Sequence, residues 1–498
     1  MARKILSLTC LLALAACAGG GSSDPERALA PASSAFLLPA EDAEPQRPGD
    51  PERGRELLLN NGTPEAPYLS CGIPRTLWNL PGVSLFLPQG ATIPDRKDSD
   101  LPYWMSSAKR PSGLDVINTN CLLCHGGQIG ADPTPLIGMP NPNRDFTNLG
   151  WFGGGVSSAA LGALSLFVSK EEGDELQRMR RVLVAQQAFP APDTVGMNAA
   201  DMLFGVLAAH RDPITLSWRD EARNTLKAED SVGVFVDAPP WWHLHRKPTM
   251  FYSGFGRGDH ARILMTASLL CLEDSDEAAQ IDAYFPDIQA YLLSLRAPKY
   301  EERVGPIDQE RADRGREHFT ARCEGCHGGK DGEGPEPRTF VPLSQVGTDP
   351  FYARLTTENE ARTGAYAFDV LFDFFNSSWY GTQSPAGRLE RQPELGYVPP
   401  PLDGIWATAP YFHNGSVPTL DAVLNPELRP GVFKRSFDPA SYDFGERVGW
   451  PYQEVAFKGL DKNVYDTNKD GYHNTGHSFA ASMSDDERRD LLEYLKTF

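Results

Sequence analysis

The chain has 498 residues, about three times the length of an average single domain, so two or more domains with sizeable cores are expected. Its formal net charge is −19, and it contains no dense block of lysine and arginine. This balance argues against nucleic acid or an anionic membrane surface as a partner, and it favours a partner that is basic or neutral.

Residues 1–16 have the pattern of a bacterial signal peptide. A charged start precedes an apolar run over residues 5–16, which is too short to remain as a membrane-spanning helix. The run ends in Leu14-Ala15-Ala16-Cys17, which resembles the bacterial lipobox, where the cysteine is acylated and becomes the first mature residue. An ordinary signal peptide with a chance cysteine near its end is the alternative.

Residues 17–50 are rich in Gly, Ser, Pro, Ala and acidic residues, a composition typical of a flexible tether. Ala18 follows Cys17, and the absence of aspartate there points to the outer membrane in bacterial lipoproteins. We therefore expect an exported protein, in the periplasm or at the outer membrane, that contacts the membrane only through a lipid on Cys17.

Four of the eight cysteines form two motifs of one kind, Cys121-Leu122-Leu123-Cys124-His125 and Cys323-Glu324-Gly325-Cys326-His327. Cys-x-x-Cys-His is the attachment pattern of c-type haem. The two thiols add to the two vinyl groups of one porphyrin edge, and the histidine that follows reaches the iron. The motifs predict two covalently bound haem c groups, with His125 and His327 as iron ligands. Disulfides within the motifs, or a shared zinc site, are the alternatives.

Two further cysteines, Cys71 and Cys271, remain as an even pair in an exported protein. We expect either a structural disulfide between them or two free buried thiols.

The chain has a duplicated layout. Residues 290–295 and 493–498 each close a helical stretch, and each follows a Cys-x-x-Cys-His motif at nearly the same distance. In the last helix, Ser484 and Glu487 form the spacing of a capping box. A less exact repeat relates Pro239-Pro240-Trp241-Trp242 to Pro400-Pro401-Leu402.

The repeats predict two cytochrome c-like haem domains, at residues 51–305 and 306–498, each beginning near its attachment motif and ending in a helix. Pro and Gly are abundant and strand-like alternation is scarce. We therefore expect a mainly α fold with long loops and insertions.

The sequence resembles the bacterial di-haem cytochrome c peroxidase superfamily. The resemblance is carried by the two attachment motifs, by Gly315-Arg316-Glu317-His318-Phe319, and by the run from Ala409-Pro410-Tyr411-Phe412-His413-Asn414-Gly415 to Leu420. The branch with the di-haem rubber oxygenases is more similar still, through Ser70-Cys71-Gly72-Ile73-Pro74 and Asn474-Thr475-Gly476-His477-Ser478-Phe479.

The resemblance implies an electron-transfer haem and a reactive haem with an open or releasable face, coupled through an aromatic side chain. It assigns His125 and His327 as proximal ligands and His477 as the distal ligand of the second haem. Trp241 or Trp242 would bridge the haems, although adjacent tryptophans are more often packing residues.

Three further expectations concern the surroundings of the haems. His413 is interpreted as a residue near the second haem that does not bind the iron. His477 has the alternative of a solvated loop histidine, beside a segment (466–471) that begins like a calcium loop but lacks its glutamate. A calcium ion therefore has weak support from the sequence. The sequence does not decide what lies on the distal side of the first haem. The candidates are a histidine ligand, from His210, His243, His245 and His260, or an open site with Phe251 or Phe255 as its wall.

Three functions fit these features. The first is a di-haem oxidoreductase that uses peroxide or dioxygen and receives electrons from a small redox protein or a quinol-linked donor. The second is an electron carrier with two six-coordinate haems. The third is an oxygenase that cleaves an apolar organic substrate. Residues 420–433 lack the methionine that the usual peroxidase has there, which weakens a simple peroxidase assignment.

Overall fold

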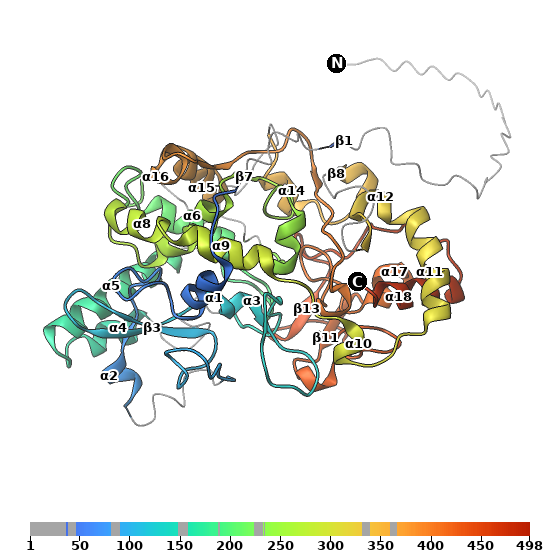
Figure 1. Cartoon of the computed structure of the whole chain (residues 1–498), viewed down its shortest axis with the longest axis horizontal. Coiled ribbons are helices and arrows are strands. Elements are labelled where there is room, and N and C mark those ends of the chain that lie inside the picture. The colour runs from blue at the N-terminus through green and yellow to red at the C-terminus, as the bar shows by residue number, and fades with distance from the viewer. Residues whose placement is uncertain are drawn as a thin grey trace, which may run out of the picture. The chain divides into compact units, whose positions relative to one another are not determined.

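The computed structural model describes residues 36–37, 46–80, 90–147, 158–187, 190–223, 233, 235–330, 339–358 and 366–498. All of these lie within one compact unit formed by residues 31–498 (Figure 1). The predicted signal peptide and Cys17 lie outside the described residues. Among those residues, no helix is both long and apolar enough to cross a bilayer.

The fold is mixed, with 39% helix and 12% strand, so the expectation of a mainly α fold is correct only in part. The α-helices are α1 (Pro51–Leu59), α2 (Arg75–Trp78), α3 (Leu122–His125), α4 (Ser158–Leu164), α5 (Lys170–Gln186), α6 (Ala200–Ala209), α7 (His260–Leu264), α8 (Ser275–Asp282), α9 (Phe285–Ser294), α10 (Tyr300–Arg303), α11 (Gln309–Arg322), α12 (Glu324–His327), α13 (Leu343–Val346), α14 (Phe351–Leu355), α15 (Tyr366–Ser377), α16 (Trp379–Thr382), α17 (Leu420–Leu424) and α18 (Asp485–Leu495). The 3₁₀ helices are η4 (Trp241–Arg246), η5 (Met265–Leu270), η7 (Ile405–Ala407), η8 (Pro426–Leu428) and η9 (Pro439–Ser441).

The strands form small antiparallel sheets. Their orders are β2-β4-β3, β12-β11-β13, β1-β8-β10, β5-β6 and β7-β9. Their bounds are β1 (Phe36–Leu37), β2 (Ile73–Pro74), β3 (Met105–Lys109), β4 (Asp115–Thr119), β5 (Gly126–Gly127), β6 (Leu136–Ile137), β7 (Gly256–Gly258), β8 (Thr339–Pro342), β9 (Gly387–Leu389), β10 (Gly396–Tyr397), β11 (Val432–Arg435), β12 (Tyr452–Glu454) and β13 (Val464–Asp466). Strands this short are set by pairing between distant segments, and they leave little alternation in the sequence for a prediction to find.

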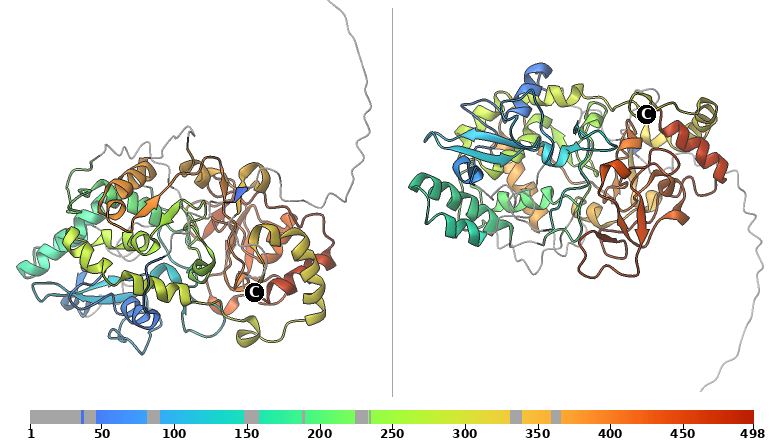
Figure 2. Two further views of the ribbon diagram at one scale, coloured as in Figure 1. Left: turned by 45° about the horizontal axis from the view of Figure 1, so that its top comes forward. Right: turned by 90° about the horizontal axis from the view of Figure 1, so that it is seen from below.

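Two pairs of helices pack in a similar way, one pair in the N-terminal region and one in the C-terminal region. Helix α1 packs on α9, and α11 packs on α18; Figures 1 and 2 both show α11 and α18 side by side. Each pair has a glycine at its point of closest approach. A Cβ on Gly54 would lie 1.8 Å from the Asp287 carbonyl oxygen, and a Cβ on Gly315 would lie 2.0 Å from that of Asp490. Only glycine lets the backbones approach this closely.

Both glycines lie in the same tetrapeptide, Arg-Gly-Arg-Glu, at residues 53–56 and 314–317. The predicted closing helices are therefore present as α9 and α18, and α18 has the expected capping box between Ser484 and Glu487. In the N-terminal half, however, the helix that pairs with the closing helix lies well before Cys121, with β2, β3 and β4 between them. The predicted start of this half, residue 51, coincides with the start of α1, and the sheet β2-β4-β3 lies between α1 and the attachment motif.

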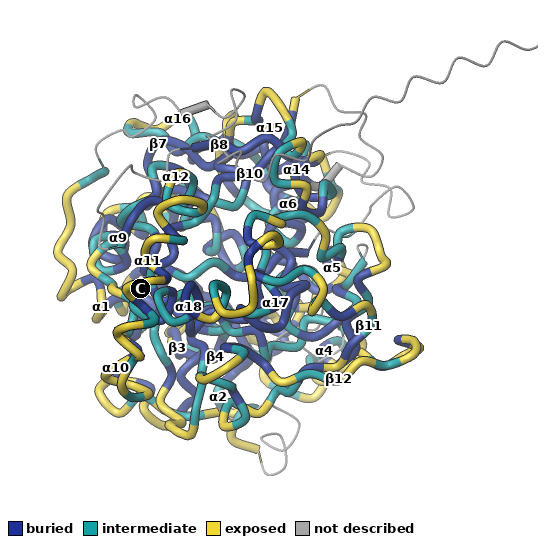
Figure 3. Tube along the Cα trace, turned by 90° about the vertical axis from the view of Figure 1, so that its right-hand side faces the viewer, coloured by how far each residue is buried: buried dark blue, intermediate teal, exposed yellow. Residues whose placement is uncertain are grey.

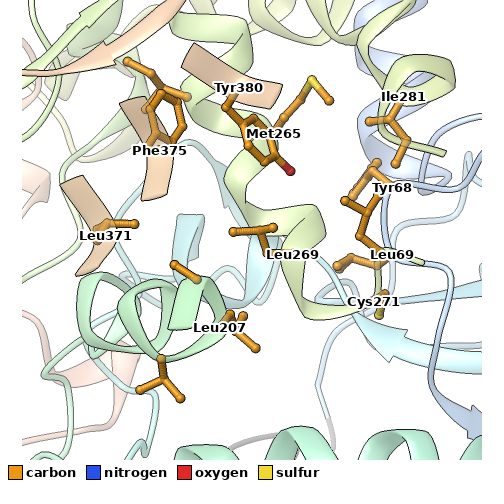
Figure 4. Packing of buried hydrophobic residues seen from close by; sticks show 14 of the residues in the cluster. Tyr68, Leu69, Leu207, Met265, Leu269, Cys271, Ile281, Leu371, Phe375 and Tyr380 are labelled. Carbon is orange, nitrogen blue, oxygen red and sulfur yellow. The ribbon is translucent and has the colours of Figure 1, made fainter. Parts of the chain in front are cut away.

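The largest apolar core extends from α1 to β10 and includes residues from both sides of position 305 (Figure 4). Helix α15 packs on α6, and β7 pairs with β9. A second core gathers α11, α18 and the segment around Trp406. In Figure 3 the buried stretches of the chain lie inside, and the exposed stretches are outer turns and loops. The predicted domain boundary at 305/306 stays a prediction.

The structure joins Cys71 and Cys271 in a disulfide, with their Cα atoms 5.1 Å apart. Both sulfur atoms are buried beside the Asn118 side chain, whose amide nitrogen lies 3.1 Å from the Cys271 Sγ. The first of the two alternatives for this pair is confirmed, and the bond ties the segment before β2 to the end of η5.

Candidate functional site

The first Cys-x-x-Cys-His motif lies at the turn between β4 and α3. The Asn120 side chain accepts a hydrogen bond from the Leu122 amide and donates to the Tyr103 carbonyl, so it fixes the start of the short helix. Cys121, Cys124 and His125 then line one cavity of about 360 Å³, here called the N-terminal cavity. Burial lowers the pKa of His125 to about 3, so its imidazole is neutral and able to bind a metal.

The lining of the N-terminal cavity is mostly apolar. It includes residues of α6, α7 and η5 together with the segment 250–252. Phe251 lines the cavity and stacks on Phe255, with ring centroids 4.2 Å apart. Within the described part of the chain, His125 is the only histidine that lines this cavity.

The other histidines considered for the first haem lie elsewhere. His210 stacks on Trp218, with centroids 5.0 Å apart, and His243 lines the second cavity. His245 and His260 line neither cavity. None of these four histidines lines the N-terminal cavity, whereas Phe251 does.

The second motif lies on α12, directly after α11. Cys323, Cys326 and His327 line a cavity of about 230 Å³, here called the C-terminal cavity. The His327 Nδ1 donates a hydrogen bond of 2.7 Å to the Pro400 carbonyl oxygen, which can only accept. That bond fixes the tautomer with Nε2 unprotonated. Metal-binding histidines are usually held by such a bond on the nitrogen that does not bind the metal.

His477 lines the same cavity, and the centroids of the His327 and His477 rings are 6.1 Å apart. With metal–nitrogen distances of about 2 Å, two imidazoles bound to opposite sides of one metal have centroids about 6 Å apart. At this separation His327 and His477 would both be able to hold one haem iron between them. His477 is half-buried with its Nδ1 atom fully buried, and burial lowers its pKa to about 3.

The loop that carries His477 is fixed by bonds from three directions. The His477 amide donates to the Val346 carbonyl oxygen at 2.6 Å. The Arg429 guanidinium donates to the carbonyl oxygens of Asn474 and Gly476. Asn414, from the segment 409–420, donates to the His473 carbonyl oxygen at 3.0 Å. The segment 409–420 therefore helps to fix the loop that carries His477.

His413 lies on the wall of the C-terminal cavity and is buried. Its ring stacks on Tyr397 with centroids 4.4 Å apart, and its Nε2 lies 3.2 Å from the Tyr397 hydroxyl. Its carbonyl oxygen accepts a hydrogen bond from the Asp237 amide at 2.7 Å. His413 therefore lies in the same cavity as the cysteines and the histidine of the second motif.

One segment forms a wall between the two cavities. Five residues line both: Asp237, Pro239, Pro240, Lys247 and Tyr252. Trp241 belongs to this wall and stacks on His125, with centroids 4.4 Å apart and an angle of 20° between the rings. Trp242 is 1% exposed and donates through Nε1 to the Asp403 carbonyl oxygen. Trp241 therefore contacts a predicted ligand directly, whereas Trp242 packs against the backbone of the other half.

The residues present fit two haem groups. Each cavity places two cysteines and a histidine of one motif on its lining, and the four cysteines are free. Burial raises the pKa of Cys121 to about 11 and that of Cys323 to about 12. The described residues contain no group of three or more His, Cys, Asp or Glu side chains suited to a metal ion, so neither zinc nor calcium gains support.

Comparison with known proteins adds a partial family match. Residues 396–434 match the family described as RoxA-like, cytochrome c-like. This match includes Pro400 and the segment 409–420. It supports the resemblance to the rubber-oxygenase-like branch and implies covalently bound haem c; the wider peroxidase superfamily is not confirmed by it.

Two curated relatives come from Sinorhizobium fredii (strain NBRC 101917 / NGR234). The uncharacterized protein y4iJ is 31% identical over 266 residues, which is 43% of this chain and 43% of y4iJ. The uncharacterized protein y4iM is 30% identical over 221 residues, which is 38% of this chain and 49% of y4iM. The match thus spans less than half the length of each relative.

Two features of the site were missed in the sequence. The repeated Arg-Gly-Arg-Glu was a usable signal for α1, because its second copy, at residues 314–317, lies only five residues before the second motif. The place of Lys247 in the wall between the cavities had no such signal, since it depends on contacts between segments far apart in the chain.

Proposed function

We propose that this chain is a di-haem c-type cytochrome that acts as an oxidoreductase, with its reactive site in the N-terminal cavity and its electron-transfer site in the C-terminal cavity. One observation carries the proposal. Two of the histidines that line the C-terminal cavity, His327 and His477, lie at a separation that would let both hold one haem iron, whereas His125 is the only histidine among the described residues that line the mostly apolar N-terminal cavity.

Each haem would be held by the thiols of one motif and by its histidine, His125 or His327, with His477 as the second ligand of the C-terminal haem. When bound, haem supplies one-electron chemistry and, where a face of the iron stays free, a site for peroxide or dioxygen. The chain contributes orientation and exclusion of water. Pro400 fixes the His327 ring, and the apolar residues of α6 shield the N-terminal cavity.

Trp241 is proposed to couple the two sites, because it stacks on His125 within the wall that both cavities share. His413 is proposed to order the C-terminal cavity through its contact with Tyr397. The electron donor is proposed to be a small redox protein or a quinol-linked donor, and export with a lipid on Cys17 would place the protein in the periplasm or at the outer membrane.

An oxygenase that cleaves an apolar organic substrate is the second candidate. The mostly apolar lining of the N-terminal cavity favours it. The alternative is an electron carrier with two six-coordinate haems. It has less support, because His125 is the only histidine among the described residues that line the N-terminal cavity.

The test is electron paramagnetic resonance of the oxidised, haem-loaded protein before and after addition of peroxide, and of the reduced protein with dioxygen. We expect one high-spin and one low-spin haem, with only the high-spin signal responding to the oxidant. Two low-spin signals that ignore both oxidants would make the protein an electron carrier.

The variant His477→Ala checks the assignment of the two sites. We expect it to convert the low-spin signal to high spin and to leave the other signal unchanged, since His477 lines only the C-terminal cavity. His473→Ala is the matched control, because His473 lies in the same loop and bonds the Thr467 carbonyl oxygen outside the cavity. A low-spin signal that survives in His477→Ala would refute the ligand assignment.

A further inference from the structure

Lys247 is a buried lysine in the wall between the two cavities. It follows η4, the helix of Trp241, and it lines both the N-terminal and the C-terminal cavity. The residue is 8% exposed. Its Nζ makes one hydrogen bond, to the Phe251 carbonyl oxygen at 3.3 Å.

This ammonium group has no carboxylate partner within the described part of the chain. No ion pair joins Lys247 to an acidic residue, and burial alone lowers its pKa, to about 8. Asp237 lies in the same wall, but the charged group that acts on it is Arg435. A buried ammonium with one of its three donors used is costly unless an anion from outside the polypeptide pairs with it.

The chemistry of the cavities indicates what that anion is. Haem c carries two propionate carboxylates, and the motif of each cavity holds the opposite, vinyl-bearing part of the porphyrin. A carboxylate buried in an apolar cavity also costs free energy unless a cation or several hydrogen-bond donors pair with it. Lys247 and Arg322 are the only lysine or arginine residues among the described residues that line the cavities. Lys247 is buried and lines both, whereas Arg322 is exposed and lines only the C-terminal cavity.

We propose that Lys247 is a positioning residue that pairs with a propionate carboxylate of a haem bound in one of the two cavities. The inference rests on the proposed haem binding at both motifs and goes beyond it, because it assigns a role to a residue outside them. A positive charge at a haem favours the reduced iron, so the pair would raise the midpoint potential of that haem.

The test compares Lys247→Met, Lys247→Gln and Lys247→Arg in the haem-loaded protein. The readouts are the haem content, the midpoint potentials from a spectroscopic redox titration, and the propionate bending bands in resonance Raman spectra. Met has a similar length and no charge, Gln keeps a donor for the Phe251 carbonyl, and Arg keeps the charge. Lys458→Met is the control, because Lys458 is also buried but bonds main-chain carbonyls away from both cavities.

We expect the Met and Gln variants to lower the midpoint potential of one haem and to shift its propionate band. Lys247→Arg should stay close to the parent protein, and Lys458→Met should change neither value. Loss of one haem from the Met and Gln variants with retention in Lys247→Arg would support the same pairing.

Two haems with unchanged potentials and bands in Lys247→Met would overturn the role of Lys247 and leave the proposed function standing. An unchanged band together with weaker binding of added dodecanoate would also overturn it, in favour of an acidic substrate as the partner. A parent protein with fewer than two haems would instead refute the proposed function.

Discussion

Replacement of Gly315 by alanine tests the close contact between α11 and α18. The added Cβ would lie 2.0 Å from the Asp490 carbonyl oxygen and 2.9 Å from the Tyr494 Cβ. Carbon and oxygen atoms that are not bonded pack at more than 3 Å, so the two helices must separate or tilt. The obstructing oxygen belongs to the main chain of α18 and cannot rotate away.

The size of the effect follows from two opposing terms. An exchange of Gly for Ala inside a helix gains about 1 kcal/mol of stability where the new methyl group is free. Overpacking of a tight contact typically costs about 1–3 kcal/mol. Because the clash here is with backbone, we expect a cost in the upper part of that range, about 2–3 kcal/mol, so that the free energy of unfolding falls by about 1–2 kcal/mol.

The assay is urea unfolding of the haem-loaded protein, followed by far-ultraviolet circular dichroism and by haem absorbance. Gly54→Ala should behave in the same way, since its Cβ would meet the Asp287 carbonyl oxygen at 1.8 Å. Gly431→Ala is the control, because a Cβ there would have no atom within 4 Å. A rise in stability for Gly315→Ala, of the kind seen at open helix positions, would refute the close approach of the two helices.

Two other predictions concern the N-terminal region. The disulfide between Cys71 and Cys271 closes a loop with a sequence separation of 200, so Cys71→Ser with Cys271→Ser should lower the free energy of unfolding by about 2–5 kcal/mol; an unfolding curve equal to that of the parent protein would contradict this. Burial raises the pKa of Asp201 from 3.8 to about 6, so the folded protein holds a proton that the unfolded chain releases, and stability should fall as the pH rises from about 4 to about 6. In Asp201→Asn, the free energy of unfolding measured across this pH range should fall less than in the parent protein. An unchanged pH dependence would show that Asp201 titrates normally.

The parts of the site that sequence reasoning found are those set by local chemistry. The two attachment motifs, with Cys121, Cys124, Cys323 and Cys326, are short runs in which spacing alone carries the meaning. The capping box at Ser484 is equally local. His477 was found only through a resemblance, because its place beside His327 depends on a loop held by Arg429 and Asn414.

The parts that were missed depend on contacts between distant segments. Strands β2 and β4 pair residues more than forty positions apart, as in Ile73 with Ile117, and neither strand is long enough to show alternation. The sequence also could not decide whether Trp241 or Trp242 would bridge the haems, because both are tryptophans at adjacent positions. The fold separates them by turning one toward His125 and the other toward the backbone at Asp403.

The wall shared by the two cavities limits how far the halves can be treated as modules. The C-terminal cavity takes part of its lining from Pro140 and from the segment that contains Asp237, His243, Lys247 and Tyr252. A fragment of residues 306–498 would keep its own cysteines and histidines, yet it would lack one side of its own cavity. Transplanting the C-terminal site into another protein would therefore require the segment 237–252 to travel with it.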